Sequence, residues 1–312
     1  MEEVRLLGYC RWLVGNKKAD YANSRPWVDS PSVPPLTKSS IATVEFPEKD
    51  ESTGEVMVGF LGPSCMDPVT ATAIEVISMY LAGSSASVLE KQMVEIEDPW
   101  CSAVRFYSED RPDTVLWLQL ASVATEKLEA AEKKLFEVLK KTVDEQLNME
   151  YLTDLIHRDR RQTMFSAESY GHSFSTPIII DHMFGNRDGR HLKLLQSLRE
   201  YEVLEKWTDQ DWRDFMRKHL ADNHHVSVLG RPSAKLLKKM EEDEQKRIAA
   251  RIEELGSDRL KELQEKLDAA KAENDRAIPP EVVGQFKVPD IDTIHFINTT
   301  TIKAGLAKDG KQ

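Results

Sequence analysis

Residues 54–83 read GEVMVGFLGPSCMDPVTATAIEVISMYLAG and combine a strand pattern with a helix pattern. Residues 55–61 form an apolar-rich run typical of a strand, which Gly62-Pro63 ends. Asp67 is a good N-cap, and Pro68 suits the first helical position, where a missing N–H costs nothing. The apolar face of the expected helix, which Gly83 ends, consists of Val69, Ala73, Val76, Ile77, Tyr80 and Leu81.

The segments on both sides extend this pattern. Residues 41–46 alternate like a strand and are expected to form a hairpin with residues 55–61. Residues 103–107 and 114–120 predict a second pair, and residues 225–230 predict a last strand. Helices are expected at residues 87–95, from about 125, at about 148–168, and at 181–184, 191–204 and 209–220. Because the strands come in adjacent pairs, the sequence predicts an α+β fold with an antiparallel-rich sheet covered by helices.

A long charged helical pattern follows at residues 233–277 and breaks at Gly256-Ser257-Asp258. One narrow apolar stripe precedes the break and a second one follows it. The two stripes are made of Leu236, Leu237, Met240, Ile248, Ile252 and Leu255, and of Leu260, Leu263, Leu267 and Ala270. Two helices that each carry one such stripe are expected to pack as an antiparallel hairpin.

These patterns divide the chain into four parts. Residues 1–38 are an N-terminal lead-in, and residues 39–232 are the α+β domain. Residues 233–277 are the helical hairpin linker, and residues 278–312 are the start of a further domain. A strand is expected in the last part at residues 293–297.

Composition restricts the class of protein. The chain has 312 residues, of which 40% are hydrophobic, and its net charge is −11, which argues against a general nucleic-acid binder. Cys10, Cys65 and Cys101 are too few and too scattered for a disulfide framework. The acidic start resembles no signal peptide, and no apolar run approaches the ~18 residues that a membrane helix needs. We therefore expect a cytoplasmic chain without nucleic-acid or membrane partners.

Motifs for catalysis or metal binding are incomplete in this sequence. The eight histidines are His157, His172, His182, His191, His219, His224, His225 and His295. They show neither His-Glu-x-x-His nor the inverted His-x-x-Glu-His of zinc hydrolases. The sequence also lacks Cys-x-x-Cys, Gly-x-Ser-x-Gly and the glycine-rich phosphate loops. No catalytic, cofactor-binding or metal-binding residue is therefore assigned.

Several other residues have a structural and a functional interpretation. Ser84 follows a helix end and serves a turn more readily than it serves as a nucleophile. Arg158, Arg160 and Arg161 form either an ion-paired surface or a contact with a partner domain or acidic peptide. Residues 169–188, with the apolar run at 177–180, suggest a packed loop that faces a cavity. The tryptophans expected as core or docking anchors are Trp117, Trp207 and Trp212.

Several of these segments resemble one family. Residues 54–63 resemble the strand that opens the second domain of M16 (insulinase/pitrilysin-type) zinc metallopeptidases. The longer matches are similar to the fungal, cytoplasmic branch related to presequence protease, from about residue 25 to residue 305. They are YLAGSSASVLE at 80–90, TEKL at 125–128, FGNRDG at 184–189, SLREY at 197–201 and LGRPS at 229–233.

The resemblance implies a hydrolase of two halves, each of two α+β domains, that closes around a chamber and degrades peptides. It implies a zinc ion held by two histidines of the inverted motif and a downstream glutamate, in a domain that would precede residue 1. Because no matching position exists here, no functional residue is carried over. The chain would then be a fragment: a non-catalytic chamber wall and hinge, whose partners are the missing catalytic and C-terminal domains.

Two other interpretations stay open. The alternative to the peptidase segment is a stand-alone interaction protein, similar to the non-peptidase scaffold members of the same superfamily, which would dock a partner through its hairpin and acidic surface. A coiled-coil adaptor would instead dimerise through residues 233–277, but the break at Gly256 favours a fold-back within one chain.

Overall fold

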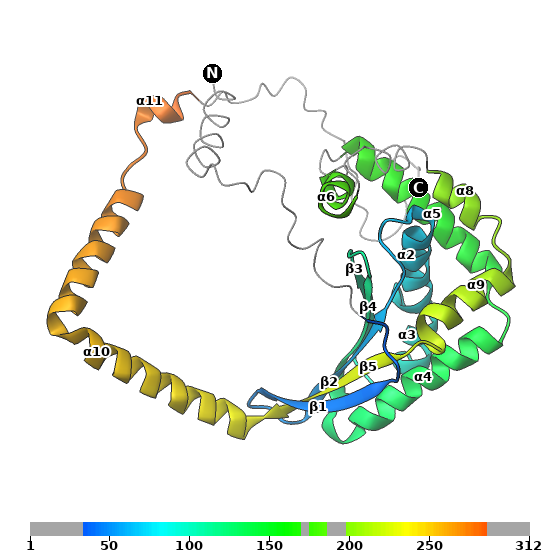
Figure 1. Ribbon diagram of the computed structural model, residues 1–312, viewed down its shortest axis with the longest axis horizontal. Helices are drawn as coiled ribbons and strands as arrows, with labels where there is room; N and C mark the ends of the chain where they lie inside the picture. The colour runs from blue at the N-terminus through cyan, green and yellow to red at the C-terminus, as the bar shows by residue number, and fades with distance from the viewer. Residues whose placement is uncertain (1–33, 170–174, 186–197, 286–312) are drawn as a thin grey trace, which may run out of the picture. The chain divides into compact units, whose positions relative to one another are not determined.

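The structure is a computed structural model that describes residues 34–169, 175–185 and 198–285 (Figure 1). The chain forms two compact units, residues 1–243 and residues 244–312. The helix expected at the start of residues 191–204 and the strand expected at residues 293–297 lie outside the described residues. The four-part division of the chain stays a prediction.

A five-stranded sheet organises the first unit, in the order β1-β5-β2-β4-β3. The β1–β5 pair is parallel, and the β5–β2, β2–β4 and β4–β3 pairs are antiparallel. This confirms the prediction of an α+β fold with an antiparallel-rich sheet. The strands are β1 (Ser40–Pro47), β2 (Thr53–Leu61), β3 (Ala103–Glu109), β4 (Val115–Ala124) and β5 (His225–Ser233).

The hairpin expected between residues 41–46 and 55–61 is wrong, because β5 lies between β1 and β2. A short connection favours pairing of neighbouring strands, but burial decides the order here. β1 is exposed along almost its whole length, as an edge strand can be, whereas β5 buries Ser227 and Leu229. β5 therefore occupies the interior position next to β2, and β1 occupies the exposed edge.

Helices lie against one side of the sheet in the first unit, where α2, α3, α4, α5 and α9 gather (Figure 1). The alternate residues of β2 and β4 that point to this side form the core with them, and Val58, Phe60 and Leu118 are fully buried. The helices are α2 (Pro68–Ala82), α3 (Val88–Met93), α4 (Leu128–Asp144), α5 (Met149–Ser169), α6 (Ser175–Phe184), α8 (Arg199–Leu204) and α9 (Asp209–Met216).

Side chains cap two of the helices, and the cap at Asp67 was predicted from the sequence. Asp67 accepts a hydrogen bond from the backbone N–H of Val69 at 3.1 Å, and Pro68 occupies the first turn of α2. At α9 the side chain of Thr208 accepts from the N–H of Asp211, and the Asp211 carboxylate accepts in return from the N–H of Thr208. Both helices therefore begin where a side chain satisfies an otherwise unpaired N–H.

The loop expected at residues 169–188 is in part a helix. Residues Ser175–Phe184 form α6, longer than the four helical residues expected at 181–184. Pro177 and Ile180 are three positions apart and share one helix face, whereas Ile178 and Ile179 are exposed. The apolar run therefore follows a helical period rather than filling a loop.

The helix α10 (Ala234–Asn274) continues from the first unit into the second, where α11 (Pro280–Val283) follows. Only Gly256 leaves the helical conformation, with φ 67° and ψ 169°. Ile252 and Leu267, on the stripes before and after Gly256, are 51% and 48% exposed. The helices and the break lie where they were expected, but the antiparallel packing of the stripes is absent from this part of the described chain. A helical hairpin uses a loop of about 2–5 residues, which one glycine does not supply.

Among the described residues, no helix is both long enough and apolar enough to span a membrane.

Candidate functional site

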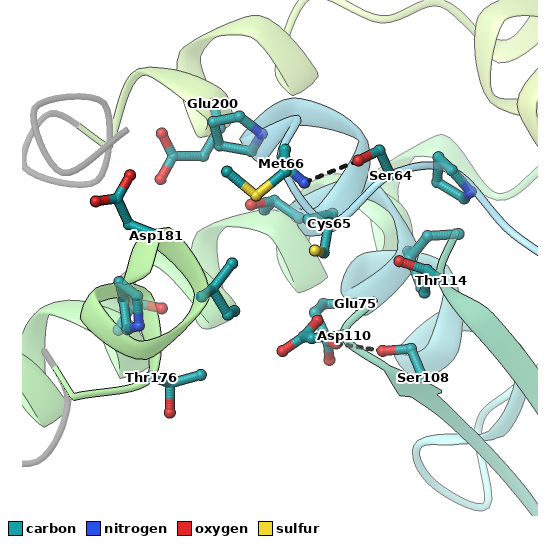
Figure 2. A pocket seen from close by; sticks show the side chains of 18 of the residues that line it. Ser64, Cys65, Met66, Glu75, Ser108, Asp110, Thr114, Thr176, Asp181 and Glu200 are labelled. Carbon is teal, nitrogen blue, oxygen red and sulfur yellow. Dashed lines mark hydrogen bonds between the residues drawn. The ribbon is translucent and has the colours of Figure 1, made fainter. Parts of the chain in front are cut away.

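A cavity of about 320 Å³ lies within the first unit, where the ends of several elements meet (Figure 2). Residues 63–68 and α2 form one side of it, and the turn between β3 and β4 forms another. Residues of α5, α6 and α8 complete the lining. Helix α6 contributes Thr176, Pro177, Ile180 and Asp181, so part of the segment expected to face a cavity does so.

Five carboxylates line this cavity, and each comes from a different element. Figure 2 shows Glu75 and Asp110 on one side of the space and Asp181 and Glu200 on the other. No lysine, arginine or histidine belongs to the described lining. The five carboxylates are Glu75, Asp110, Asp159, Asp181 and Glu200.

The surroundings of Glu75, Asp110, Asp159 and Glu200 disfavour negative charge on these side chains. Burial raises the pKa of Glu75, and the nearby carboxylates of Asp159 and Asp110 raise it further. Burial also raises the pKa values of Asp110, Asp159 and Glu200. The cavity therefore concentrates carboxylates whose ionisation costs free energy.

Neutral hydroxyl groups hold two of the carboxylates in place. Tyr201 donates a hydrogen bond to Oδ2 of Asp159 at 2.8 Å, and the Thr163 hydroxyl lies 3.0 Å from the Tyr201 oxygen. Ser108 donates to Oε1 of Glu75 at 3.4 Å. These contacts fix the carboxylates without neutralising them.

The thiol of Cys65 lies on the wall of the same cavity. Burial, followed by the charge of Asp110, raises its pKa to about 11. A thiol with such a pKa stays protonated at neutral pH and is a poor nucleophile. The Cys65 thiol is therefore not activated as a nucleophile by its surroundings.

The sheet also has a face opposite the helical layer, which we call the open face. Directly paired residues share a face, so Val226, Gly59, Trp117 and Tyr107 form one row across β5, β2, β4 and β3. Val226 is 37% exposed, and Val44 of β1, on the same face, is 51% exposed. Among the described residues, this row is mainly apolar.

The described histidines are dispersed. His157 Nε2 lies 3.5 Å from Glu205, and the His225 ring stacks on Phe136 with 4.1 Å between ring centres. Burial lowers the pKa of His219 to about 4. His172, His191 and His295 lie outside the described residues.

No group of three or more His, Cys, Asp or Glu side chains suited to a metal ion occurs in the described part of the chain. The zinc site that the resemblance implies belongs to another domain and stays a prediction.

The arginine cluster and two of the tryptophans have structural contacts. Arg160 lies 3.7 Å from the carboxylate of Glu205, and Arg158 contacts the sulfur of Met79 at 3.7 Å. Trp212 is fully buried, with the Trp207 ring 4.7 Å away in an edge-on arrangement. These residues stabilise the core and its surface, whereas Trp117 lies on the open face.

Ser84 takes part in the turn that follows α2. Its backbone N–H donates to the Ser87 hydroxyl at 3.0 Å, and its own hydroxyl lies 3.4 Å from that of Tyr151. These are the contacts of a turn residue, and the described residues that hydrogen-bond to the Ser84 hydroxyl include no base.

Comparisons with known proteins agree with this fold. Residues 15–158 match the family model described as the peptidase M16 inactive domain. An uncharacterized protein of Schizosaccharomyces pombe is 30% identical over 90% of this chain, and one of Saccharomyces cerevisiae is 29% identical over 89%. The chain spans 27% of the length of each of these two relatives.

A solved structure supports the fold independently. The crystal structure of a protease from Helicobacter pylori matches 64% of this chain and 45% of its own chain, with a TM-score of 0.50 and 18% identity. At that identity the likeness concerns the fold alone. Residues 15–158 are thus similar in sequence to the peptidase M16 inactive domain, and the described structure shares the fold of the Helicobacter pylori protease.

Proposed function

We propose that this chain is a non-catalytic segment of a larger M16-type zinc metallopeptidase, in which it forms part of the wall around a bound peptide. The observation that carries the proposal is the open face of the sheet. All strands of the described sheet contribute to it, and it presents apolar side chains in an inactive-type M16 domain. Exposed apolar surface of this kind is typical of binding surfaces.

The open face suits an extended, variable ligand. Its central row is apolar and includes two aromatic rings, those of Trp117 and Tyr107, which are paired across β4 and β3. Polar groups occur beside this row: Gln119 donates to Glu55 at 3.0 Å and accepts from Arg105 at 3.3 Å. Such a surface makes contacts that depend little on one particular side chain, as a peptidase that accepts many peptides requires.

The proposal assigns the chemistry to other domains. The partners of this chain are the catalytic domain, which would hold zinc and activate water, and a C-terminal half reached through α10. The chain covers 27% of the length of each of two relatives, which supports this division of roles between domains. The cytoplasmic location, the hinge role of α10 and the relation to the fungal presequence-protease branch belong to the same proposal.

The experiment is a substitution on the open face in the whole natural protein. Val44→Glu and Val226→Glu would each place a charge where the peptide is expected to lie. We expect KM for a peptide substrate to rise several-fold, with zinc content and unfolding temperature unchanged. Val203→Glu on α8 is the matched control, because Val203 is also exposed, at 41%, but belongs to the helical layer. Equal effects of all three substitutions would contradict the proposal.

A second measurement concerns the purified chain itself. We expect it to contain less than stoichiometric zinc and to cleave no peptide. Stoichiometric zinc, or cleavage that co-purifies with the chain, would overturn the assignment as a non-catalytic segment.

A further inference from the structure

We propose that His219 makes the connection between α9 and β5 an acid-sensitive latch, which opens locally when the imidazole ring takes up a proton. The latch consists of the π-helix η4 (Arg217–Ala221) and the two residues that follow it, up to Asn223. Short π-helices are rare and frequently occur at functional positions. The proposal rests on the contacts of the latch and does not depend on the proposed function.

The His219 ring lies in apolar surroundings. His219 is 7% exposed, and the centre of its ring lies 4.6 Å from that of the Phe215 ring. No residue in the described part of the chain forms a hydrogen bond with a ring nitrogen of His219. A protonated imidazole carries two N–H donors and a positive charge, both of which require polar partners. Protonation of the buried ring therefore costs free energy.

The carboxylates nearest the latch are paired with other cations. Asp214 of α9 and Asp144 of α4 both contact Arg217, at 3.4 Å and 3.0 Å. Asp222, directly after η4, contacts Lys140 of α4 at 2.8 Å. Helix α4 packs against η4, so these ion pairs surround the latch. None of the three carboxylates is left over as a partner for a protonated His219.

The remaining neighbours of His219 also disfavour a positive charge. Lys218 is a cation, and the end of β2 that contacts the latch, residues 59–61, carries no ionisable side chain. Burial, followed by the charge of Lys218, lowers the pKa of His219 to about 4. A ring exposed by opening regains an ordinary pKa of about 6.5. Between these two values the open form binds the proton more tightly, so each fall in pH favours opening.

Asn223 connects the latch to the sheet. Its side-chain amide donates to the backbone oxygen of Leu61 at 2.9 Å and to that of His219 at 3.2 Å. Leu61 ends β2, and Asn223 lies just before β5, so one amide joins the end of a central strand to the start of its neighbour. Release of a protonated His219 ring would break this bridge, while α2 keeps its own contacts. We therefore expect the latch to open before the domain unfolds.

Hydrogen exchange of the full chain, measured by mass spectrometry between about pH 7 and about pH 5, tests the latch. Protection factors correct for the direct effect of pH on exchange. We expect the protection of residues 214–223 to fall about tenfold per pH unit below about pH 6.5, as the uptake of one proton requires. The protection of α2 in the same samples should change far less.

His219→Gln and His219→Phe each remove the titrating group from the latch. Both variants should lose the extra fall in protection at residues 214–223, and the second one serves if a buried glutamine prevents folding. His224→Gln is the matched control, because His224 is an exposed histidine outside the latch and its loss should leave the pH dependence unchanged. Thermal unfolding at neutral pH confirms that the variants are folded.

Two kinds of result would overturn the proposal. One is a protection of residues 214–223 that does not depend on pH, or that falls equally in a folded His219→Gln or His219→Phe variant. The other is an equal fall at residues 214–223 and in α2, which would show that acid unfolds the whole domain rather than the latch.

Discussion

Gly59 lies directly opposite Trp117 across the β2–β4 pair, and the indole ring of Trp117 covers it. A Cβ atom at position 59 would lie 2.9 Å from Cζ3 of that ring. The ring nitrogen of Trp117 is buried and has no hydrogen-bond partner in the described part of the chain. The glycine therefore lets a large aromatic ring lie flat in the centre of the open face.

Substitution of Gly59 by alanine should displace this ring. We expect Gly59→Ala to lower the free energy of unfolding by roughly 1–3 kcal/mol, the usual cost of inserting a methyl group into packed surroundings. Urea unfolding followed by circular dichroism measures the change. Gly230→Ala is the control in the same sheet, because its Cβ atom would meet only ordinary contacts at 3.5 Å. Equal losses in the two variants would refute the packing of Trp117 on Gly59.

Neutralisation of Glu75 should change how stability depends on pH. Burial and the carboxylates of Asp159 and Asp110 raise the pKa of Glu75 above its ordinary value of 4.5. The folded state then holds the proton more tightly than the unfolded chain does. The stabilisation is fully present below pH 4.5 and is lost as pH rises through the raised pKa.

Glu75→Gln should therefore gain stability relative to the unmodified chain as pH rises from about 4.5 toward neutrality. Denaturant unfolding of both proteins at several pH values measures this difference. Both proteins share the other ionisable groups of the pocket, which therefore do not contribute to the difference. These groups include Cys65, Asp181, Glu200 and Tyr201. Glu95→Gln controls for the loss of one charge elsewhere. A difference that stays constant with pH would show that the carboxylate is not disfavoured in the folded state.

Removal of the Tyr201 hydroxyl should weaken the wall of the pocket. Tyr201 is buried, and its hydroxyl joins Asp159 on α5 to α8. Tyr201→Phe leaves the carboxylate of Asp159 without this donor, so we expect a loss of about 1–3 kcal/mol in the free energy of unfolding. Tyr107→Phe is the control, because Tyr107 is exposed on the open face and should change stability by less than about 0.5 kcal/mol. Similar values for both would contradict the role of this hydrogen bond.

Substitution of Gly256 tests the break in α10. Its φ of 67° and ψ of 169° belong to a region that is essentially restricted to glycine. No atom lies within 4 Å of a Cβ at this position, so only the backbone resists a side chain. Gly256→Ala should favour a continuous helix and increase the helical circular dichroism signal. A signal that is unchanged or lower would show that the break does not depend on glycine.

The fold was predictable where local signals agree with burial. Asp67 and Pro68 begin α2 as expected, because capping and proline act within one turn. The partner of β1 was not predictable, since the choice between β2 and β5 depends on which strand gains more from the interior. The local sequence pattern therefore predicted the helices and strands. The order of the strands in the sheet depends on tertiary contacts, which the pattern does not contain.

The candidate pocket lacked a sequence signature for a similar reason. Glu75 and Glu200 are far apart in the chain, and acidic residues are common in a sequence with 53 of them. No spacing rule connects them, because five elements must pack before their carboxylates meet. The apolar run at residues 177–180 was the one signal, and it indicated a cavity although its helical form was missed.

Photocross-linking in the whole natural protein tests the central claim most directly. A substrate peptide with one benzophenone group is bound, irradiated and mapped by mass spectrometry. The account predicts labels on open-face residues of the sheet, such as Val226, Met57 and Trp117, and their loss when unlabelled peptide competes. Competed labels confined to the helical layer, for example to α4 or α9, would contradict the proposal that this domain presents its open sheet face to the peptide.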